Sequence, residues 1–210
     1  MLRLKKKLNT GINGNRIISI GVIAASEAAG CTSVAVSLSM FLHHIKGYQV
    51  AIVEKSPRKS FRKMALLEHA THLCCYSHKL NNVDFFYENI DSHIHYNEKL
   101  NNCFANYEYI VTDYGKYSDS TLGEVFNCDY QVIVASLQGW KCNDTKELLS
   151  KLDEYGNKWC FKNSVCIIQG TEKALNDVRK HRKVCVKSMP YISDSTRLNN
   201  ELVDFYKNII

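Results

Sequence analysis

A run of small and hydroxyl-bearing residues near the N-terminus has the composition of a loop that could cradle phosphate. Residues 25–33 read Ala-Ser-Glu-Ala-Ala-Gly-Cys-Thr-Ser and follow an apolar stretch. Small side chains let backbone amides approach an anion, and a helix that begins at Thr32 and Ser33 would direct the positive end of its dipole at that anion. The same pattern also suits a loop without a ligand, in which Gly30 closes the turn and Thr32 caps the helix.

Histidine and cysteine residues crowd into a second segment that could do chemistry. Its members are His69, His72, Cys74, Cys75 and His78. Imidazole and thiolate groups ligate zinc, but the spacing here matches no established ligand pattern. A helix that carries core cysteines and exposed histidines is the simpler interpretation.

Basic residues form two clusters. The first lies at positions 3, 5, 6 and 7, and the second consists of Lys55, Arg58, Lys59, Arg62 and Lys63. Either cluster could contact acidic lipid or nucleic acid. The net charge of +6 is mild, and no aromatic RNA-binding signature accompanies the clusters. We therefore predict solvated charged surfaces and do not expect nucleic acid as a partner, whereas contact with an anionic membrane surface stays open.

The elements that would position the loop alternate between two patterns. Apolar stretches rich in β-branched residues predict strands at 17–23, 50–53, 109–112, 131–135, 165–168 and 184–186. Helical periodicity occurs at 32–46, 143–155, 171–181 and 198–210. This order predicts an α/β fold, a doubly wound and mainly parallel sheet with helices on both faces. Ligands of such sheets bind beyond the carboxyl ends of the strands.

Length and composition indicate one domain over residues 15–210, preceded by a basic N-terminal arm over residues 1–14. The 210 residues suffice for a buried core, and no linker or repeat divides them. The segment 58–106 has the least regular pattern, and within it we predict a strand near 83–87 and a helix near 97–106. The apolar stripe of the last helix, at 198–210, predicts packing on the sheet rather than on a membrane.

Several features indicate the compartment. The longest apolar stretch is too short to span a bilayer, and the N-terminus lacks the apolar core of a signal peptide. The nine cysteines are odd in number and include no C-x-x-C pair, so a disulfide framework is not indicated. We expect a cytoplasmic protein.

The loop and the segments that follow it resemble the ParA/MinD-type P-loop ATPases. Residues 25–33 resemble the deviant Walker A loop of that family, G-K-G-G-x-G-K-[ST]-[ST], and residues 51–57 resemble its strand that closes in D-x-D-P. Residues 107–115 resemble the Walker B strand, with Asp113 at the magnesium-shell position and Gly115 in the switch. Residues 128–134 match the next strand, and Met-Pro-Tyr at 189–191 is similar to the late I-P-Y turn. The ordered set implies a P-loop NTPase-like three-layer αβα fold and is most similar to the pilus-assembly (CpaE/TadZ-like) branch.

The resemblance also implies a set of site residues. A nucleotide would contact Ser26, Gly30, Cys31, Thr32 and Ser33, and Mg²⁺ would be held by Thr32 and Asp113. The family's two loop lysines are absent, however, since Cys31 replaces the one that reaches the β- and γ-phosphates and Ser26 replaces the one that crosses the dimer interface. Glu27 adds a carboxylate. Because phosphoryl transfer depends on positioning and charge stabilisation, we expect no hydrolysis and no catalytic residues, and either no cofactor or weakly bound ATP or ADP with Mg²⁺.

These inferences favour a degenerate ParA/MinD-like protein, a pseudo-ATPase that localises or assembles a bacterial machine such as a pilus or a secretion system. The resemblance implies a homodimer, or a heterodimer with a related ATPase that keeps its lysines, within a larger protein assembly that could also bring it to a membrane. Two alternatives stay open. One is a nucleotide-dependent switch or ATPase that uses a partner's lysines, and the other is a nucleic-acid-binding module that acts through the basic clusters.

Overall fold

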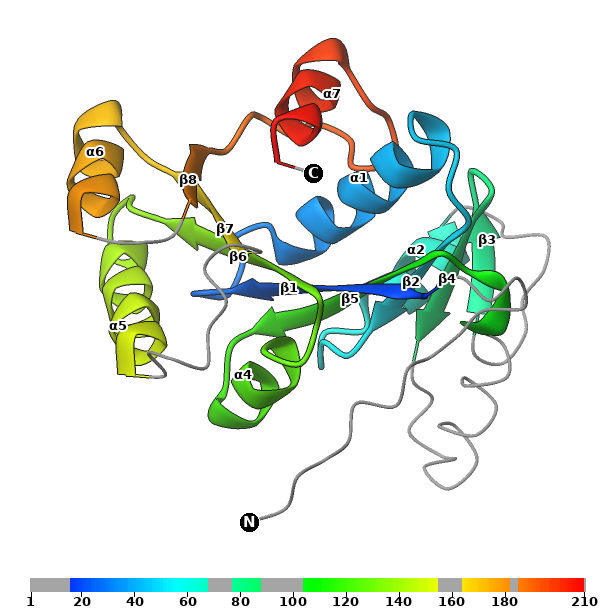
Figure 1. The fold of residues 1–210 in the computed structure, drawn as a ribbon, viewed down its shortest axis with the longest axis horizontal. Coiled ribbons are helices and arrows are strands. Elements are labelled where there is room, and N and C mark those ends of the chain that lie inside the picture. Colours follow the sequence, from blue (N-terminus) through cyan, green and yellow to red (C-terminus); the bar gives the residue numbers. More distant parts are fainter. Residues whose placement is uncertain (1–15, 68–76, 88–103, 155–163, 182–184, 210) are drawn as a thin grey trace.

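The computed structural model describes residues 16–67, 77–87, 104–154, 164–181 and 185–209, and they form one sheet with helices on both sides (Figure 1). The eight strands are in the order β3-β4-β2-β5-β1-β6-β7-β8. Their bounds are β1 Ile18–Ala24, β2 Val50–Glu54, β3 Ser77–Leu80, β4 Val83–Tyr87, β5 Tyr109–Lys116, β6 Tyr130–Ser136, β7 Ser164–Gln169 and β8 Cys185–Ser188. Every neighbouring pair is parallel except β3 and β4, which are antiparallel. The predicted fold class is therefore confirmed.

Burial on both faces explains why the central strands are continuously apolar. Successive side chains of a strand point to opposite faces. In and just after β1, Ile20 and Val22 belong to one core cluster, and Ile23 and Ala25 belong to another on the opposite face. A polar residue at any of these positions would lose its hydration, so the sequence shows no polar alternation there.

The helices fill the two outer layers. Their bounds are α1 Cys31–His44, α2 Ser60–Leu67, α4 Asp119–Val125, α5 Lys141–Glu154, α6 Glu172–His181 and α7 Asn200–Lys207, with a 3₁₀ helix, η1, at Phe104–Asn106. Figure 1 shows α1 and α7 on one side of the sheet and α4 and α5 on the other. Core residues of α1 join the first cluster and those of α4 and α5 join the second. None of the helices in the described ranges is long and apolar enough to cross a bilayer.

The last helix, α7, packs chiefly against α1, which corrects the expectation that it packs on the sheet. Tyr206 is 1 % exposed, and its ring lies 5.5 Å from that of Phe41, centroid to centroid. Its hydroxyl is hydrogen-bonded to the Ser37 hydroxyl, with 2.7 Å between the oxygens. The helix α7 does bury an apolar stripe. Because α1 already covers the adjoining strands, this stripe packs against α1.

Three short elements were not predicted, namely α2, α4 and β3. The sequences of α4 and β3 are short and largely polar, and α2 has only eight residues in the segment with the least regular pattern. The strand predicted near 83–87 is confirmed as β4. Of the helix predicted near 97–106, residues 104–106 form η1 and the rest lie outside the described residues. The arm 1–14 and residues 69–76 of the histidine- and cysteine-rich segment also lie outside them.

His78 corrects the expectation of exposed histidines on a helix. It lies in the edge strand β3 and is 1 % exposed. Its ring stacks on Phe85 at 4.8 Å between centroids, and neither ring nitrogen has a hydrogen-bond partner in the described part of the chain. Burial lowers the pKa of the His78 imidazole.

Candidate functional site

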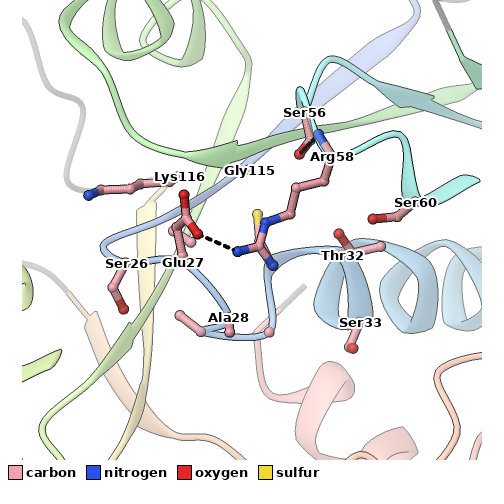
Figure 2. A pocket seen from close by; sticks show the side chains of 14 residues that line it. Ser26, Glu27, Ala28, Thr32, Ser33, Ser56, Arg58, Ser60, Gly115 and Lys116 are labelled. Atoms are coloured by element: carbon pink, nitrogen blue, oxygen red, sulfur yellow. Dashed lines mark hydrogen bonds and ion pairs between the residues drawn. The ribbon is translucent and has the colours of Figure 1, made fainter. Parts of the chain in front are cut away.

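A cavity of about 310 Å³ lies at the carboxyl end of β1, where the chain turns into α1 (Figure 2). One wall is Ala24 with the loop residues 26–33, a second comes from Ser56, Arg58 and Ser60, and a third from Gly115 and Lys116. The five residues proposed for nucleotide contact, Ser26, Gly30, Cys31, Thr32 and Ser33, all belong to the first wall. The cavity is therefore at the edge of the sheet where parallel α/β folds bind their ligands.

The loop keeps a backbone that normally requires glycine. Gly30 has a φ of +95° and is the N-cap residue of α1. Ala28 has a φ of +54° although it carries a side chain, and it stands where the Walker A pattern has a glycine. No side chain caps α1, so the interpretation of Thr32 as an N-cap is wrong. The first-turn amides of α1 are left to bind solvent or an anion.

The hydroxyl of Thr32 is directed instead at Asp113. Thr32 Oγ1 donates a hydrogen bond to Asp113 Oδ2 over 2.7 Å, and the Gly115 backbone N–H donates to Asp113 Oδ1 over 3.0 Å. Asp113 is fully buried within β5, three residues before its end. A hydroxyl and a carboxylate beside a phosphate-sized cavity are the kind of oxygen ligands that Mg²⁺ takes in nucleotide sites. This pair fits the proposed magnesium site, in which the ion would neutralise phosphate charge.

Cys31 occupies the place of the missing phosphate-binding lysine without offering a charge. The side chain is 7 % exposed, and the thiol lies 3.5 Å from the carbonyl oxygen of Val22. Burial, together with the nearby Asp113 carboxylate, raises the pKa of the Cys31 thiol well above its usual value. The thiol therefore stays neutral and is unsuited to nucleophilic chemistry.

The remaining charges at the loop come from elsewhere in the chain. Arg58 Nη2 lies 2.7 Å from Glu27 Oε2, and Figure 2 shows the Arg58 side chain reaching over the loop to make this ion pair. Lys141 donates from Nζ to the carbonyl oxygen of Ala28 over 2.9 Å. Sequence reasoning placed Arg58 only in a general basic cluster, since nothing in the local pattern links it to a loop 31 positions earlier.

The end of β2 also differs from the expected pattern. Glu54 is buried and accepts hydrogen bonds from the backbone N–H groups of Ser60 and Phe61, at 2.5 and 2.9 Å. It therefore holds the start of α2 rather than ending a strand in solvent. Ser56, where the D-x-D-P pattern has its second aspartate, lines the cavity. Glu27 is consequently the one carboxylate in the cavity wall formed by the described residues.

The described residues give little support to the zinc site and to the basic surface considered from the sequence. The part of the chain that is described contains no group of three or more His, Cys, Asp or Glu side chains able to hold a metal. Within the second basic cluster, Lys55 forms an ion pair with Glu124 and Arg58 forms one with Glu27. Two of the cations in this cluster are thus already paired with carboxylates.

The sheet order, the strand-to-helix loop and the Thr32–Asp113 pair define the fold class as that of the ParA/MinD-type P-loop ATPases. Solved structures with this fold include a plasmid partition protein from Borrelia burgdorferi bound to AMPPNP, with a TM-score of 0.60, 18 % identity, and coverage of 92 % of this chain and 96 % of the other. The MinC:MinD complex of Aquifex aeolicus gives a TM-score of 0.58 and 15 % identity, with 85 % of each chain covered. A ParA family ATPase from Chlorobium tepidum gives 0.56 and 14 %, with 91 % of each covered.

These likenesses establish the fold. No protein-family model matches the sequence, and no curated protein matches it either. The similarity to the pilus-assembly branch and the loss of hydrolysis therefore remain predictions.

Proposed function

We propose that this chain is a non-hydrolysing ParA/MinD-like subunit that localises or assembles other proteins in a larger bacterial machine, such as a pilus or a secretion system. In this role the P-loop cavity is a binding or structural feature. The chain would act as a homodimer, or as a heterodimer with a related ATPase.

The observation that supports the proposal most directly is that the Cys31 side chain is buried and uncharged. Its position is where the fold brings a lysine to the phosphates, and here it holds a buried, neutral thiol. Ser26, at the second lysine position, is 1 % exposed and equally uncharged. With Ser56 in place of an aspartate, the loop has neither the cations that stabilise phosphoryl transfer nor a free carboxylate to orient water.

Phosphate release from ATP tests the absence of hydrolysis. Purified protein with Mg²⁺ should give the same background rate as the Asp113→Ala variant, because neither has a functioning catalytic charge set. Turnover by the wild type that disappears in Asp113→Ala would contradict the proposal. A contaminating ATPase would be recognised because it is unaffected by the substitution.

A second function is favoured by the hydrogen bond from Thr32 to Asp113. That pair is retained in a geometry suited to Mg²⁺, which supports a nucleotide-dependent switch completed by a partner's lysines. Turnover that arises only when a related, lysine-containing ATPase is mixed with this chain, and that is lost with Thr32→Ala, would favour this second function over the first. Ser120→Ala is the matched control, because it removes an exposed hydroxyl of α4 that lies outside the cavity wall.

A further inference from the structure

The side chains of Arg58 and Glu27 meet at the cavity that residues 26–33 line. Their ion pair joins Nη2 and Oε2 at 2.7 Å, and both residues line the cavity. Arg58 comes from the loop between β2 and α2, whereas Glu27 belongs to the phosphate-binding loop itself. The guanidinium is therefore already held beside the position to which a P-loop brings phosphate (Figure 2).

The other basic side chains near the cavity do not lie beside this phosphate position. Lys116 lines the cavity, but its side chain extends away from Arg58 in Figure 2. Lys141 is engaged with the Ala28 carbonyl oxygen. Of the two described cations that line the cavity, Arg58 is thus the one directed over the loop.

The ion pair is of a kind that a phosphate can displace. The side chains of Arg58 and Glu27 are 47 % and 66 % exposed, and ion pairs between such exposed groups contribute little. A phosphate offers more than a carboxylate, because it accepts a bidentate, charge-assisted pair from arginine and also binds helix N-terminal amides. Replacement of the Glu27 carboxylate by a phosphate group, as the ion-pair partner of Arg58, is therefore favourable.

Two further features of the cavity favour an anionic ligand. The first is the start of α1, where the N-cap residue Gly30 supplies no side-chain hydrogen bond and the first-turn amides can bind an anion. The second is Ser26, which lines the cavity and whose buried hydroxyl has no hydrogen-bond partner within the described residues, although buried hydroxyl groups are normally satisfied. Because Figure 2 draws this hydroxyl turned away from Arg58, an anion beside Arg58 would accept hydrogen bonds first from the amides.

We propose that Arg58 is the phosphate-binding cation of this site, and that Glu27 is an internal competitor that holds the guanidinium until a phosphorylated ligand replaces it. The ligand class is a phosphate or diphosphate group, whether free or part of a nucleotide. This inference rests on the function proposed above, because it assigns a ligand to the cavity of a non-hydrolysing subunit.

Calorimetric titration of the full chain with ADP, ATP, pyrophosphate and inorganic phosphate, each with and without Mg²⁺, tests the proposal. Glu27→Gln should bind about fivefold more tightly than the wild type, because the competitor loses its charge. Arg58→Gln should bind at least about tenfold more weakly, because a charge-assisted contact is lost. Equal affinity for pyrophosphate and ADP would identify the phosphates alone as the ligand, and preference for ADP would identify a nucleotide.

The double variant Glu27→Gln/Arg58→Gln separates competition from simple repulsion. If Glu27 acts by occupying Arg58, its substitution should bring no gain once Arg58 is absent. A fivefold gain that persists in the Arg58→Gln background would overturn the competitor role. Circular dichroism and thermal unfolding establish that each variant is folded.

Matched controls lie outside the cavity wall. Arg62→Gln removes an exposed cation of α2, and Glu124→Gln removes the carboxylate of another exposed ion pair. Both should leave the affinity unchanged within about twofold.

The outcomes for the two proposals can be told apart. Wild-type affinity in Arg58→Gln, or no binding of any probe at millimolar concentration by the wild type and Glu27→Gln, would overturn the role of Arg58 and leave the assembly function intact. ATP turnover lost in Asp113→Ala would overturn the non-hydrolysing function, while the affinities would still report on Arg58.

Discussion

Ala28 has a φ of +54° in the loop between β1 and α1, a backbone region that L-residues seldom adopt. The left-handed conformation costs an alanine about 1–2 kcal/mol, whereas glycine adopts it freely. The loop thus keeps the shape of a glycine-rich P-loop at a cost in stability. Contacts around it, including the hydrogen bond from Lys141 to the Ala28 carbonyl oxygen, help to hold this conformation.

Ala28→Gly should therefore leave the free energy of unfolding unchanged or raise it by up to about 1 kcal/mol, as relief of strain offsets the greater entropy of unfolded glycine. Chemical denaturation measures the change. Ala29→Gly is the control, since Ala29 is buried and has no positive φ, and it should lower the free energy by about 1 kcal/mol. Equal destabilisation by both substitutions would show that Ala28 is not strained.

The thiol of Cys31 should react slowly with alkylating reagents in the native protein. It is buried and its pKa is raised by burial and by Asp113, and the thiolate is the reactive form. Mass spectrometry of peptides after a short treatment with iodoacetamide at neutral pH measures the modification. Cys185, which is exposed, is the internal reference and should react first. Faster modification of Cys31 than of Cys185 would contradict the neutral, inert thiol on which the proposed function depends.

At the scale of elements, α1 links the site to the rest of the molecule. Its N-terminus forms part of the cavity wall, and its face with Ser37 and Phe41 contacts α7. Tyr206 fixes the two helices together through its ring contact with Phe41 and its hydrogen bond to Ser37. Packing of α7 thereby stabilises the helix that follows the loop of the candidate site.

Tyr206→Phe should lower the free energy of unfolding by about 0.5–1.5 kcal/mol, because it removes the hydroxyl that is hydrogen-bonded to Ser37 and, over 3.4 Å, to the Val34 carbonyl oxygen. Tyr206→Ala should lower it by about 3–5 kcal/mol, because it leaves a cavity between α1 and α7. Urea denaturation measures both. Tyr191→Phe, at a side chain that is 78 % exposed, should have no effect. If Tyr206→Ala cost as little as Tyr206→Phe, α7 would not be part of the cooperative fold.

At the scale of the whole molecule, the buried His78 couples stability to pH. Its pKa is lowered by burial, whereas an unfolded histidine titrates near about 6.5. The unfolded chain therefore binds the proton more tightly than the folded chain. The stabilisation associated with neutral His78 is fully present above about pH 6.5 and is lost as the pH falls toward the folded-state pKa.

The melting temperature should accordingly fall as the pH is lowered from 7.5 to about 5.5, and His78→Phe should reduce this slope because phenylalanine can keep the stacking on Phe85 without titrating. Thermal unfolding at several pH values, each variant compared with itself at pH 7.5, measures the effect. His44→Gln is the comparison. Partial burial and the neighbouring His43 also lower the pKa of His44, so this substitution should change the slope in the same direction, but less, because His44 is exposed whereas His78 is buried. An unchanged slope in His78→Phe would mean that other groups account for the acid sensitivity.

The fold class and the resemblance of the loop to a Walker A pattern could both be predicted from the sequence alone. Strands buried on both faces leave continuous apolar runs, and helices leave a periodic stripe, so both are visible in short windows of the chain. That Ser26 and Cys31 stand where the Walker A pattern has lysines can be seen from the order of residues 25–33. These features depend only on residues that are close together in the chain, so they can be recognised in the sequence.

The tertiary structure decided which distant side chains meet. Thr32 and Asp113 are 81 positions apart and Glu27 and Arg58 are 31 apart, and only the pairing of β1, β2 and β5 brings their ends to one edge of the sheet. The same holds for α7, which rests on α1, and for His78, which a short polar strand carries into the core. A polar residue in a loop or edge strand has no local periodicity that reveals its partner, so its role depends on contacts that form only on folding.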